Sequence, residues 1–136
     1  MIKVLLMMYR KLMSDAVANS LGENPEFKLF LEQNYQNAEC AAMSYLPDIA
    51  VVEVPESKSH QIHDYLAICT AIRRASPRCK LMLMCPENSI ESKQAAVEAM
   101  KSGVIDDFIY YNVSMDYLVS KLEVLGAGKD SPKNGP

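Results

Sequence analysis

The chain has 136 residues, of which 49% are hydrophobic, and this length is enough for one compact domain but too short for two. Its formal net charge of -3 and sequence pI of about 5.4 offer no basic surface for phosphate backbones, so direct binding of nucleic acid is not expected. The opening stretch MIKVLLMMYRK has too few apolar residues for a signal sequence or a membrane span, and the four cysteines form no CxxC pair. Together these features favour a cytoplasmic protein.

Short apolar runs alternate along the chain with longer amphipathic runs, a pattern typical of a parallel sheet covered by helices. Five strands and five helices are predicted in alternation, with boundaries at residues such as Pro47, Pro77 and Gly103. The strands are expected at 2–8, 27–32, 49–54, 80–85 and 107–111, and the helices at about 12–21, 36–46, 65–76, 89–102 and 114–125.

This alternation predicts an α/β fold of the flavodoxin-like type, a doubly wound sheet of five parallel strands between two helical layers. We expect the domain to cover residues 1–125, and residues 126–136, which are mostly Gly, Pro, Lys and Ser, to form a disordered tail or linker. In such folds ligands bind beyond the carboxyl ends of the strands, where the strand order reverses. The residues predicted at those ends are Met8, Tyr9, Glu53, Cys85, Pro86, Tyr110, Tyr111 and Asn112.

Four segments, IKVLL, PDIAVVE, RRASPRCKLMLMCP and DDFIYYN, occur in an order and at a spacing that resemble the framework of a response-regulator receiver domain. The resemblance covers roughly residues 1–125. It implies a site in which an acidic pair binds magnesium and an aspartate accepts phosphate from a histidine kinase. A Ser or Thr, a Lys and an aromatic residue that changes rotamer on activation complete that site in the family.

This chain departs from the family at most of these positions. Phe108 alone retains the family's residue type, as the aromatic switch residue. The loop at 55–64 lacks the usual Gly and is about four residues longer than the family's loop. The resemblance places Met8 and Tyr9 at the acidic pair, Glu53 at the phosphoacceptor, Cys85 at the Ser/Thr position and Tyr111 at the lysine.

These departures predict that the phosphorelay chemistry has been lost. Magnesium requires hard oxygen ligands, which thioether and phenol groups replace poorly, and one carboxylate is not enough. A tyrosine also stabilises a transferred phosphoryl group far less well than a lysine. The extra methylene of Glu53 displaces its carboxylate by about 1 Å, which can cost on the order of 100-fold in rate. We therefore expect neither enzymatic activity nor a metal or cofactor.

Glu53 has two interpretations at this stage. It either mimics a phosphorylated aspartate permanently, or it is a carboxylate at the rim of the sheet, solvated or hydrogen-bonded to a loop amide. The tyrosines Tyr9, Tyr110 and Tyr111 likewise either plug the former phosphate cleft or line a pocket for a small molecule.

Two further groups of residues are candidates for chemistry. His60 and His63 form an HxxH pair, but without a third ligand they are expected to be surface residues rather than a zinc site. Cys85 is expected to be a buried, inert thiol rather than a nucleophile, because nothing visible in the sequence would lower its pKa.

The leading hypothesis is a pseudo-receiver, a phosphorylation-independent protein-interaction module in signal transduction or transcriptional control. Its partner, another protein or a second copy, would bind the face formed from about Ser89 to Leu125; an output domain beyond the tail could bind DNA. The alternatives are a small-molecule sensor that uses the former phosphate cleft, and a phosphorylatable receiver. That face carries charges of both signs, which fit either a homodimer interface or an ordinary solvated surface. The charged residues are Glu91, Lys93, Lys101, Asp106, Asp107, Asp116 and Lys121.

Overall fold

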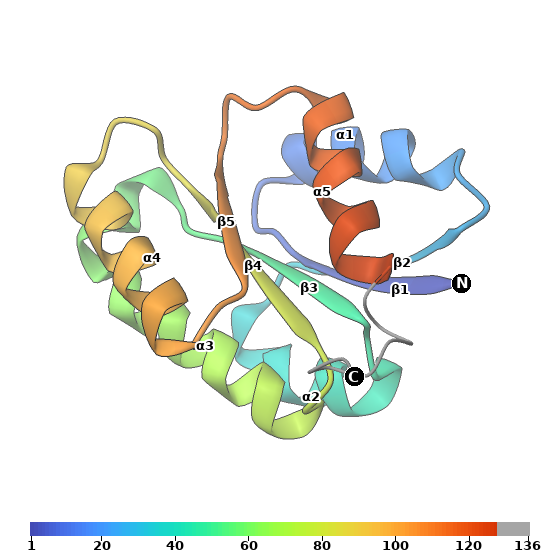
Figure 1. The fold of residues 1–136 in the computed structure, drawn as a ribbon, viewed down its shortest axis with the longest axis horizontal. Helices are drawn as coiled ribbons and strands as arrows, with labels where there is room; N and C mark the ends of the chain where they lie inside the picture. Colours follow the sequence, from blue (N-terminus) through green and yellow to red (C-terminus); the bar gives the residue numbers. More distant parts are fainter. Residues whose placement is uncertain (128–136) are drawn as a thin grey trace.

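The computed structural model describes residues 1–127, without the side chains of residues 59 and 60. Along this part of the chain five β-strands alternate with five α-helices, as predicted, and two short 3-10 helices join them (Figure 1). The elements are β1 (Ile2–Met7), α1 (Lys11–Gly22), β2 (Phe27–Glu32), η1 (Tyr35–Asn37), α2 (Ala38–Tyr45), β3 (Ile49–Glu53), η2 (Glu56–Gln61), α3 (Ile62–Ala75), β4 (Lys80–Cys85), α4 (Ile90–Ser102), β5 (Asp107–Tyr110) and α5 (Met115–Ala127).

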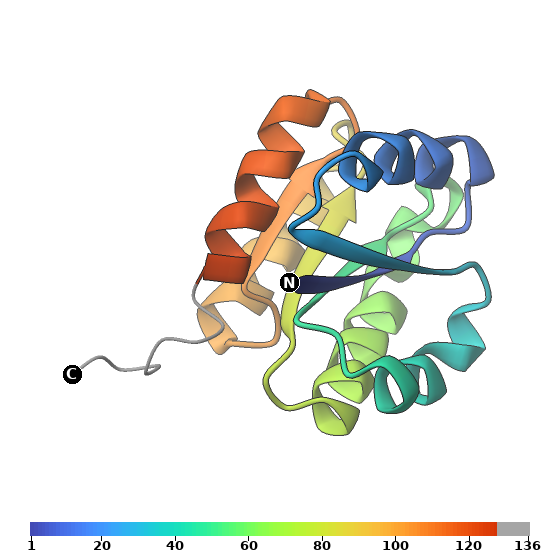
Figure 2. The same ribbon diagram turned by 90° about the vertical axis from the view of Figure 1, so that its right-hand side faces the viewer.

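The strands form one parallel sheet in the order β2-β1-β3-β4-β5. Successive side chains of a strand point to opposite faces, so each strand supplies both layers of the core. In β1, Leu5 and Met7 join the cluster beneath α2, α3 and α4, whereas Val4 and Leu6 join the cluster beneath α1 and α5. Figure 2 shows helices on both sides of the sheet. The predicted doubly wound, flavodoxin-like fold is confirmed.

The middle of the sheet is built from strands that are buried on both faces. Every residue of β3 is buried, and in β4 only Lys80 is partly exposed. Such continuous apolar strands are typical of parallel sheets covered on both sides. Glu53 is the one charged residue of β3 and ends that strand, so its carboxylate enters a buried environment at the carboxyl edge of the sheet.

The termini of α4 follow from its sequence. The Ser89 side chain accepts a hydrogen bond from the Ser92 backbone N–H at 3.1 Å, which caps the first turn. Gly103 ends the helix with φ +83°, a left-handed conformation that glycine adopts without a Cβ clash. The predicted cap at Gly103 is confirmed.

One local prediction was wrong. The polar stretch 55–64 was predicted to be a loop, but η2 and the first turn of α3 lie within it, and Ile62 is buried there. A single apolar residue among polar neighbours gives too weak a periodic signal to reveal a helical turn.

The C-terminal helix also extends past the predicted domain boundary. Helix α5 continues to Ala127, and within it Gly126 is buried against Ile2, where a Cβ would come within 2.4 Å of the Ile2 side chain. The remainder of the predicted tail, 128–136, lies outside the described residues. None of the helices in the described part of the chain combines the length and apolar character that a membrane span requires.

Candidate functional site

The Glu53 carboxylate lies at the centre of the carboxyl edge of the sheet and is completely buried, with 0% of its surface exposed. Its Oε1 accepts hydrogen bonds from the backbone N–H groups of Tyr9, at 3.1 Å, and Arg10, at 3.3 Å. Its Oε2 accepts a hydrogen bond from Nε of the Arg10 guanidinium. Both carboxylate oxygens are therefore engaged within the chain, and the expectation of a hydrogen bond to a loop amide is confirmed, whereas solvation at the rim is not.

Arg10 supplies the charge that balances Glu53. The chain leaves β1 at Met7, and Arg10 occupies the N-cap position of α1 in an extended conformation. From there its side chain, which is 34% exposed, turns back over the end of β3. Burial alone would lower the pKa of Arg10, but the hydrogen bond and charge of Glu53 raise it overall, so the guanidinium stays charged. Arg10 was not among the site residues predicted from the sequence.

Tyr111 closes the site from the side of β5. Its backbone N–H donates to the carbonyl oxygen of Cys85 at 3.1 Å, and the Arg10 guanidinium carbon lies 4.1 Å from the centre of its ring. This is the geometry of a cation–π contact. Burial, followed by the negative charge of Glu53, raises the pKa of Tyr111, so its phenol stays neutral. Tyr111 therefore packs over the Arg10 cation and does not itself supply a positive charge.

Tyr35 supports the site from below. Its hydroxyl lies 2.8 Å from the Met7 carbonyl oxygen and 2.6 Å from the Glu53 carbonyl oxygen, and it donates to this pair. The Tyr65 ring meets the Tyr35 ring edge-on, with centroids 5.5 Å apart. Burial and the charge of Glu53 raise the pKa of Tyr35, which keeps the donating proton in place. Tyr35 follows β2 and gave no signal in the sequence beyond an aromatic residue in a polar loop.

Comparisons with known proteins identify the fold. No protein-family model matches the sequence, and no curated protein matches it significantly. A response regulator from Thermotoga maritima aligns with a TM-score of 0.76 at 20% identity, over 92% of this chain and 97% of that one. The receiver domain of the Francisella response regulator 1452 aligns with a TM-score of 0.74 at 18% identity, over 93% and 98%. A CheY-like receiver domain protein from Methanospirillum hungatei JF-1 aligns with a TM-score of 0.77 at 13% identity, over 99% of both chains.

The chain has the fold of response-regulator receiver domains. In this receiver fold the residues at the predicted positions are only partly brought together. Glu53 and Tyr111 both face Arg10, and the Tyr9 backbone N–H binds Glu53 while its side chain is 44% exposed. Met8 is fully buried in the core beneath α1 and α5 and contributes no group to the site. The strand alternation that sends Leu6 to this layer also sends Met8 there.

Cys85 and Phe108 belong to the opposite layer of the receiver fold. Both lie in or against the core beneath α2, α3 and α4, and the Phe108 ring meets the Tyr110 ring edge-on at 5.8 Å. Burial raises the pKa of the Cys85 thiol from 9.0 to about 12. The thiol is therefore protonated at neutral pH, as expected for an inert core cysteine. Phe108 is partly buried and packs against this core.

The donor set of this receiver fold does not fit a magnesium ion. The oxygens of Glu53 already accept three hydrogen bonds, and the Arg10 guanidinium occupies the space beside Oε2 with a fixed positive charge. A dication would have to displace that cation and find further oxygen ligands. Within the part of the chain whose side chains are described, no three His, Cys, Asp or Glu residues gather into a possible metal site. His63 is exposed on α3, and the side chain of His60 lies outside the described set.

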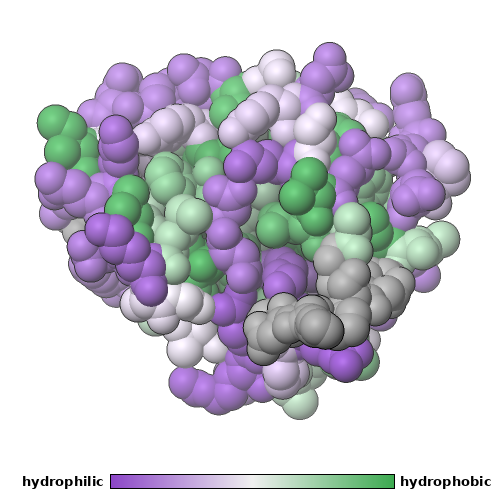
Figure 3. Space-filling view, in the orientation of Figure 1, coloured by the Kyte–Doolittle hydropathy of each residue, from purple (hydrophilic) through white to green (hydrophobic). Residues whose placement is uncertain are grey.

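The face formed by α4, β5 and α5 carries much of the exposed apolar surface of the receiver fold. Ile90, Met100, Tyr117 and Val124 are exposed there, and Figure 3 shows apolar patches on both sides of a polar stripe on this side of the molecule. A hollow of about 710 Å³ runs along β5 and is lined by Phe108, Tyr117 and others. Exposed apolar residues therefore gather along this face.

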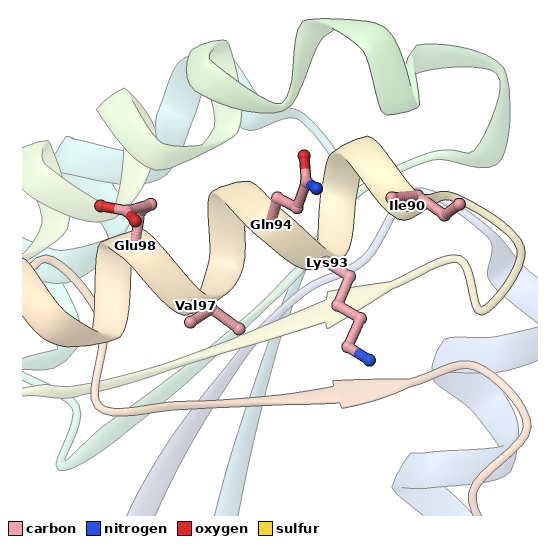
Figure 4. Close-up of a pocket in the computed structure, with 5 residues that line it drawn as sticks. All are labelled: Ile90, Lys93, Gln94, Val97 and Glu98. Carbon is pink, nitrogen blue, oxygen red and sulfur yellow. The ribbon is translucent and has the colours of Figure 1, made fainter.

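A second hollow, of about 610 Å³, lies on the outer surface of α4. Figure 4 shows Lys93 and Val97 pointing from the helix toward the side of β5, while Gln94 points the other way. Ile90, at the start of the same helix, is exposed, whereas Val97 is half-buried. The hollow therefore extends the exposed surface from β5 across α4.

Three of the charges predicted to form a self-complementary interface on this face are paired within the chain. Asp106 binds the Arg73 guanidinium and accepts a hydrogen bond from the Leu81 backbone N–H at 2.8 Å. Asp107 binds Lys121 Nζ at 2.7 Å. These three side chains were expected to be exposed but are half-buried, because long-range pairing between elements leaves no periodic signal in the sequence. Glu91, Lys93, Lys101 and Asp116 are exposed as expected.

Proposed function

We propose that this chain is a receiver-type module of signal transduction that acts in the cytoplasm and binds a protein partner without accepting phosphate. The observation that carries the proposal is the buried ion pair between Glu53 and Arg10. An acceptor carboxylate must offer a free oxygen to the phosphoryl group. Here both oxygens already accept hydrogen bonds from Arg10 or its neighbour Tyr9.

The same ion pair favours a fixed structure over mimicry of the phosphorylated state. A phosphorylated aspartate adds negative charge that must be met by cations outside the acceptor residue. Glu53 is neutralised by Arg10 at the point where that charge would act, and Tyr111 covers the cation. Arg10 thus takes the place of both the metal ion and the cationic side chain in this proposal, as a counter-ion supplied by the chain itself.

The direct test combines phosphodonor labelling with thermal unfolding. Incubation with acetyl phosphate and magnesium should leave the intact mass unchanged, and magnesium with beryllofluoride should leave the melting temperature unchanged. An orthodox receiver domain treated in parallel serves as the positive control. A hydroxylamine-labile phosphoryl group on Glu53 would overturn the proposal and support a phosphorylatable receiver.

We further propose that the face formed by α4, β5 and α5 binds the partner. The exposed apolar residues on it and the hollow along β5 support this assignment, whereas the internally paired Asp106, Asp107 and Lys121 weaken the case for a homodimer there. Val124→Asp should abolish capture of the native complex. Leu12→Asp, an equally drastic change at an exposed residue of α1, is the matched control and should leave it intact. Loss in both variants, or in neither, would contradict the assignment.

A small-molecule sensor is the second candidate function. Arg10 Nη2 and the Tyr111 hydroxyl are buried and have no hydrogen-bond partner among the described residues. Such groups are where a small polar ligand, or a water molecule, would be held. A metabolite that raises the melting temperature of the wild type but not of Tyr111→Phe would support this candidate.

A further inference from the structure

The edge of the sheet opposite to β5 is formed by β2, and on its outer side the backbone groups of Leu29 and Leu31 have no backbone partner among the described residues. The Ile2 N–H donates to the Glu26 carbonyl at 2.6 Å, and Ile2 is in register with Phe27. In a parallel ladder the N–H and C=O of one residue point to the same side, and successive residues alternate. Even-numbered residues of β2 therefore bind β1, while the backbone groups of Leu29 and Leu31 point away from the sheet.

No described helix covers this edge. Figure 2 views β2 from the outside, between α1 above and α2 below. The side chain of Leu31 is 46% exposed, and Lys28 is also exposed. An open edge with free N–H and C=O groups is a template for pairing with another strand.

The side chains of β2 indicate which strand would pair with this edge. If a second copy of β2 runs antiparallel with Phe30 on the two-fold axis, Leu29 of one copy faces Leu31 of the other, and Lys28 faces Glu32. Directly opposed residues of an antiparallel pair point to the same face, so the opposite charges meet twice, once on each side of the axis. Within one chain these two charges are about 13 Å apart along the strand and cannot pair.

The hydrogen-bonding pattern agrees with this register. Leu29 and Leu31 are the residues with outward backbone groups, and they face each other as hydrogen-bonded pairs when Phe30 lies on the axis. Centring the pairing one residue earlier, on Leu29, would set Lys28 against Phe30, so that neither Lys28 nor Glu32 would meet an opposite charge. Charge complementarity therefore selects one register and one partner, a second copy of the chain.

The surroundings of the edge are apolar. The rings of Phe30 and Tyr45 stack with their centroids 4.1 Å apart, and Lys28 Nζ lies 5.6 Å from the centre of the Phe30 ring. On α2, Met43 is 60% exposed, and Leu46, which directly follows that helix, is also exposed. Glu32 uses Oε2 to accept a hydrogen bond from the Asn34 N–H at 3.0 Å, which leaves Oε1 for a second donor.

From these features we infer that two copies of the chain pair through antiparallel β2 strands, which joins their sheets into one. The pairing aligns Lys28 of each copy with Glu32 of the other and covers the apolar residues beside the edge. It does not depend on the proposed function. Because β5 is at the opposite edge, the face of α4, β5 and α5 remains free in both copies.

Sedimentation of charge variants tests this inference. The wild type should be a dimer, and Lys28→Glu or Glu32→Lys should each weaken the dimer at least about tenfold, because like charges then face each other twice. The double variant Lys28→Glu/Glu32→Lys should restore it, since the two charges have only exchanged places. Both residues are on the surface or half-buried, so circular dichroism should show an unchanged fold.

A matched control separates this edge from the opposite one. Lys101→Glu makes the same charge change on exposed α4 and should leave the dimer intact, as should Val124→Asp. A monomeric wild type at the highest soluble concentration would overturn the inference. So would a dimer that survives both single variants, that fails to return in the double variant, or that is lost in Val124→Asp.

Discussion

The hydroxyl of Tyr35 lies 2.6 Å from the main-chain carbonyl oxygen of Glu53, at the carboxyl end of the central strand β3. The same hydroxyl lies 2.8 Å from the carbonyl oxygen of Met7, which ends the neighbouring strand β1. One phenol thus bridges the ends of two adjacent strands directly beneath the ion pair of the site. Without it, the two carbonyl groups would lose the hydrogen-bond donor that they share.

Tyr35→Phe should therefore destabilise the fold without removing the ring. Loss of this hydroxyl should lower the free energy of unfolding by about 1–2 kcal/mol, the usual cost of leaving a buried acceptor unpaired. Urea unfolding gives the value. Tyr65→Phe preserves the edge-on contact between the two rings and should change stability by much less. Equal effects of the two changes would show that the Tyr35 hydroxyl contributes nothing specific.

Arg10→Met should destabilise the protein more than other changes of surface cations. It leaves the carboxylate of Glu53 buried with only two backbone N–H donors. Breaking one side of a fully buried pair costs several kcal/mol, and the partial exposure of Arg10 reduces this to about 2 kcal/mol. Lys11→Met is the matched control, since Lys11 forms only an exposed pair with Asp15, and it should have almost no effect.

A double-mutant cycle distinguishes the ion pair from simple loss of side-chain packing. Glu53→Gln removes the charge that Arg10 balances, so Arg10→Met should cost less in that background than in the wild type. Denaturant unfolding of the four proteins gives the coupling free energy. If the two effects simply add, the buried pair is not the source of the loss.

Most of the fold could be predicted from the sequence because its signals are local. The run IAVVE is apolar and rich in β-branched residues, and Pro47 and Pro55 stand on either side of it, so both the strand and its end at Glu53 are evident. Gly103 marked the end of α4 in the same way, through a conformation that glycine favours.

The site could be predicted only in part, because its decisive contacts join residues far apart in the chain. The position of Glu53 was evident, but its partner Arg10 is 43 residues away and gave no signal beyond a cation at the start of a helix. The burial of Met8 could have been predicted from the sequence, since strand alternation sends Leu6 to the same layer. The pairing of Arg73 with Asp106 had no local signal at all.

The four cysteines should differ sharply in reactivity toward a thiol reagent. Cys40 is exposed on α2, whereas Cys69, Cys79 and Cys85 are buried in the core. In the native protein one thiol should react quickly, and the other three only on unfolding. Cys40→Ser should remove the fast phase completely. A fast phase that persists in this variant would mean that the core opens readily around one of the buried cysteines.

Stability should fall with rising pH in the alkaline range. Burial raises the pKa values of Cys69, Cys79 and Cys85 from 9.0 to about 12. In the unfolded chain these thiols ionise near 9, so above this pH the unfolded state loses protons that the folded state retains. The free energy of unfolding should therefore be insensitive to these thiols below pH 9 and decline between about pH 9 and pH 12.

Urea unfolding at a series of pH values measures this decline. Cys69→Ala removes one of the buried thiols and should make the slope shallower, by about one proton per molecule. Cys40→Ser removes an exposed thiol and should leave the slope unchanged, which makes it the matched control. Tyr35 and Tyr111, whose pKa values burial also raises, should steepen the decline above pH 10. A slope that is the same in both cysteine variants would mean that the core thiols do not titrate on unfolding.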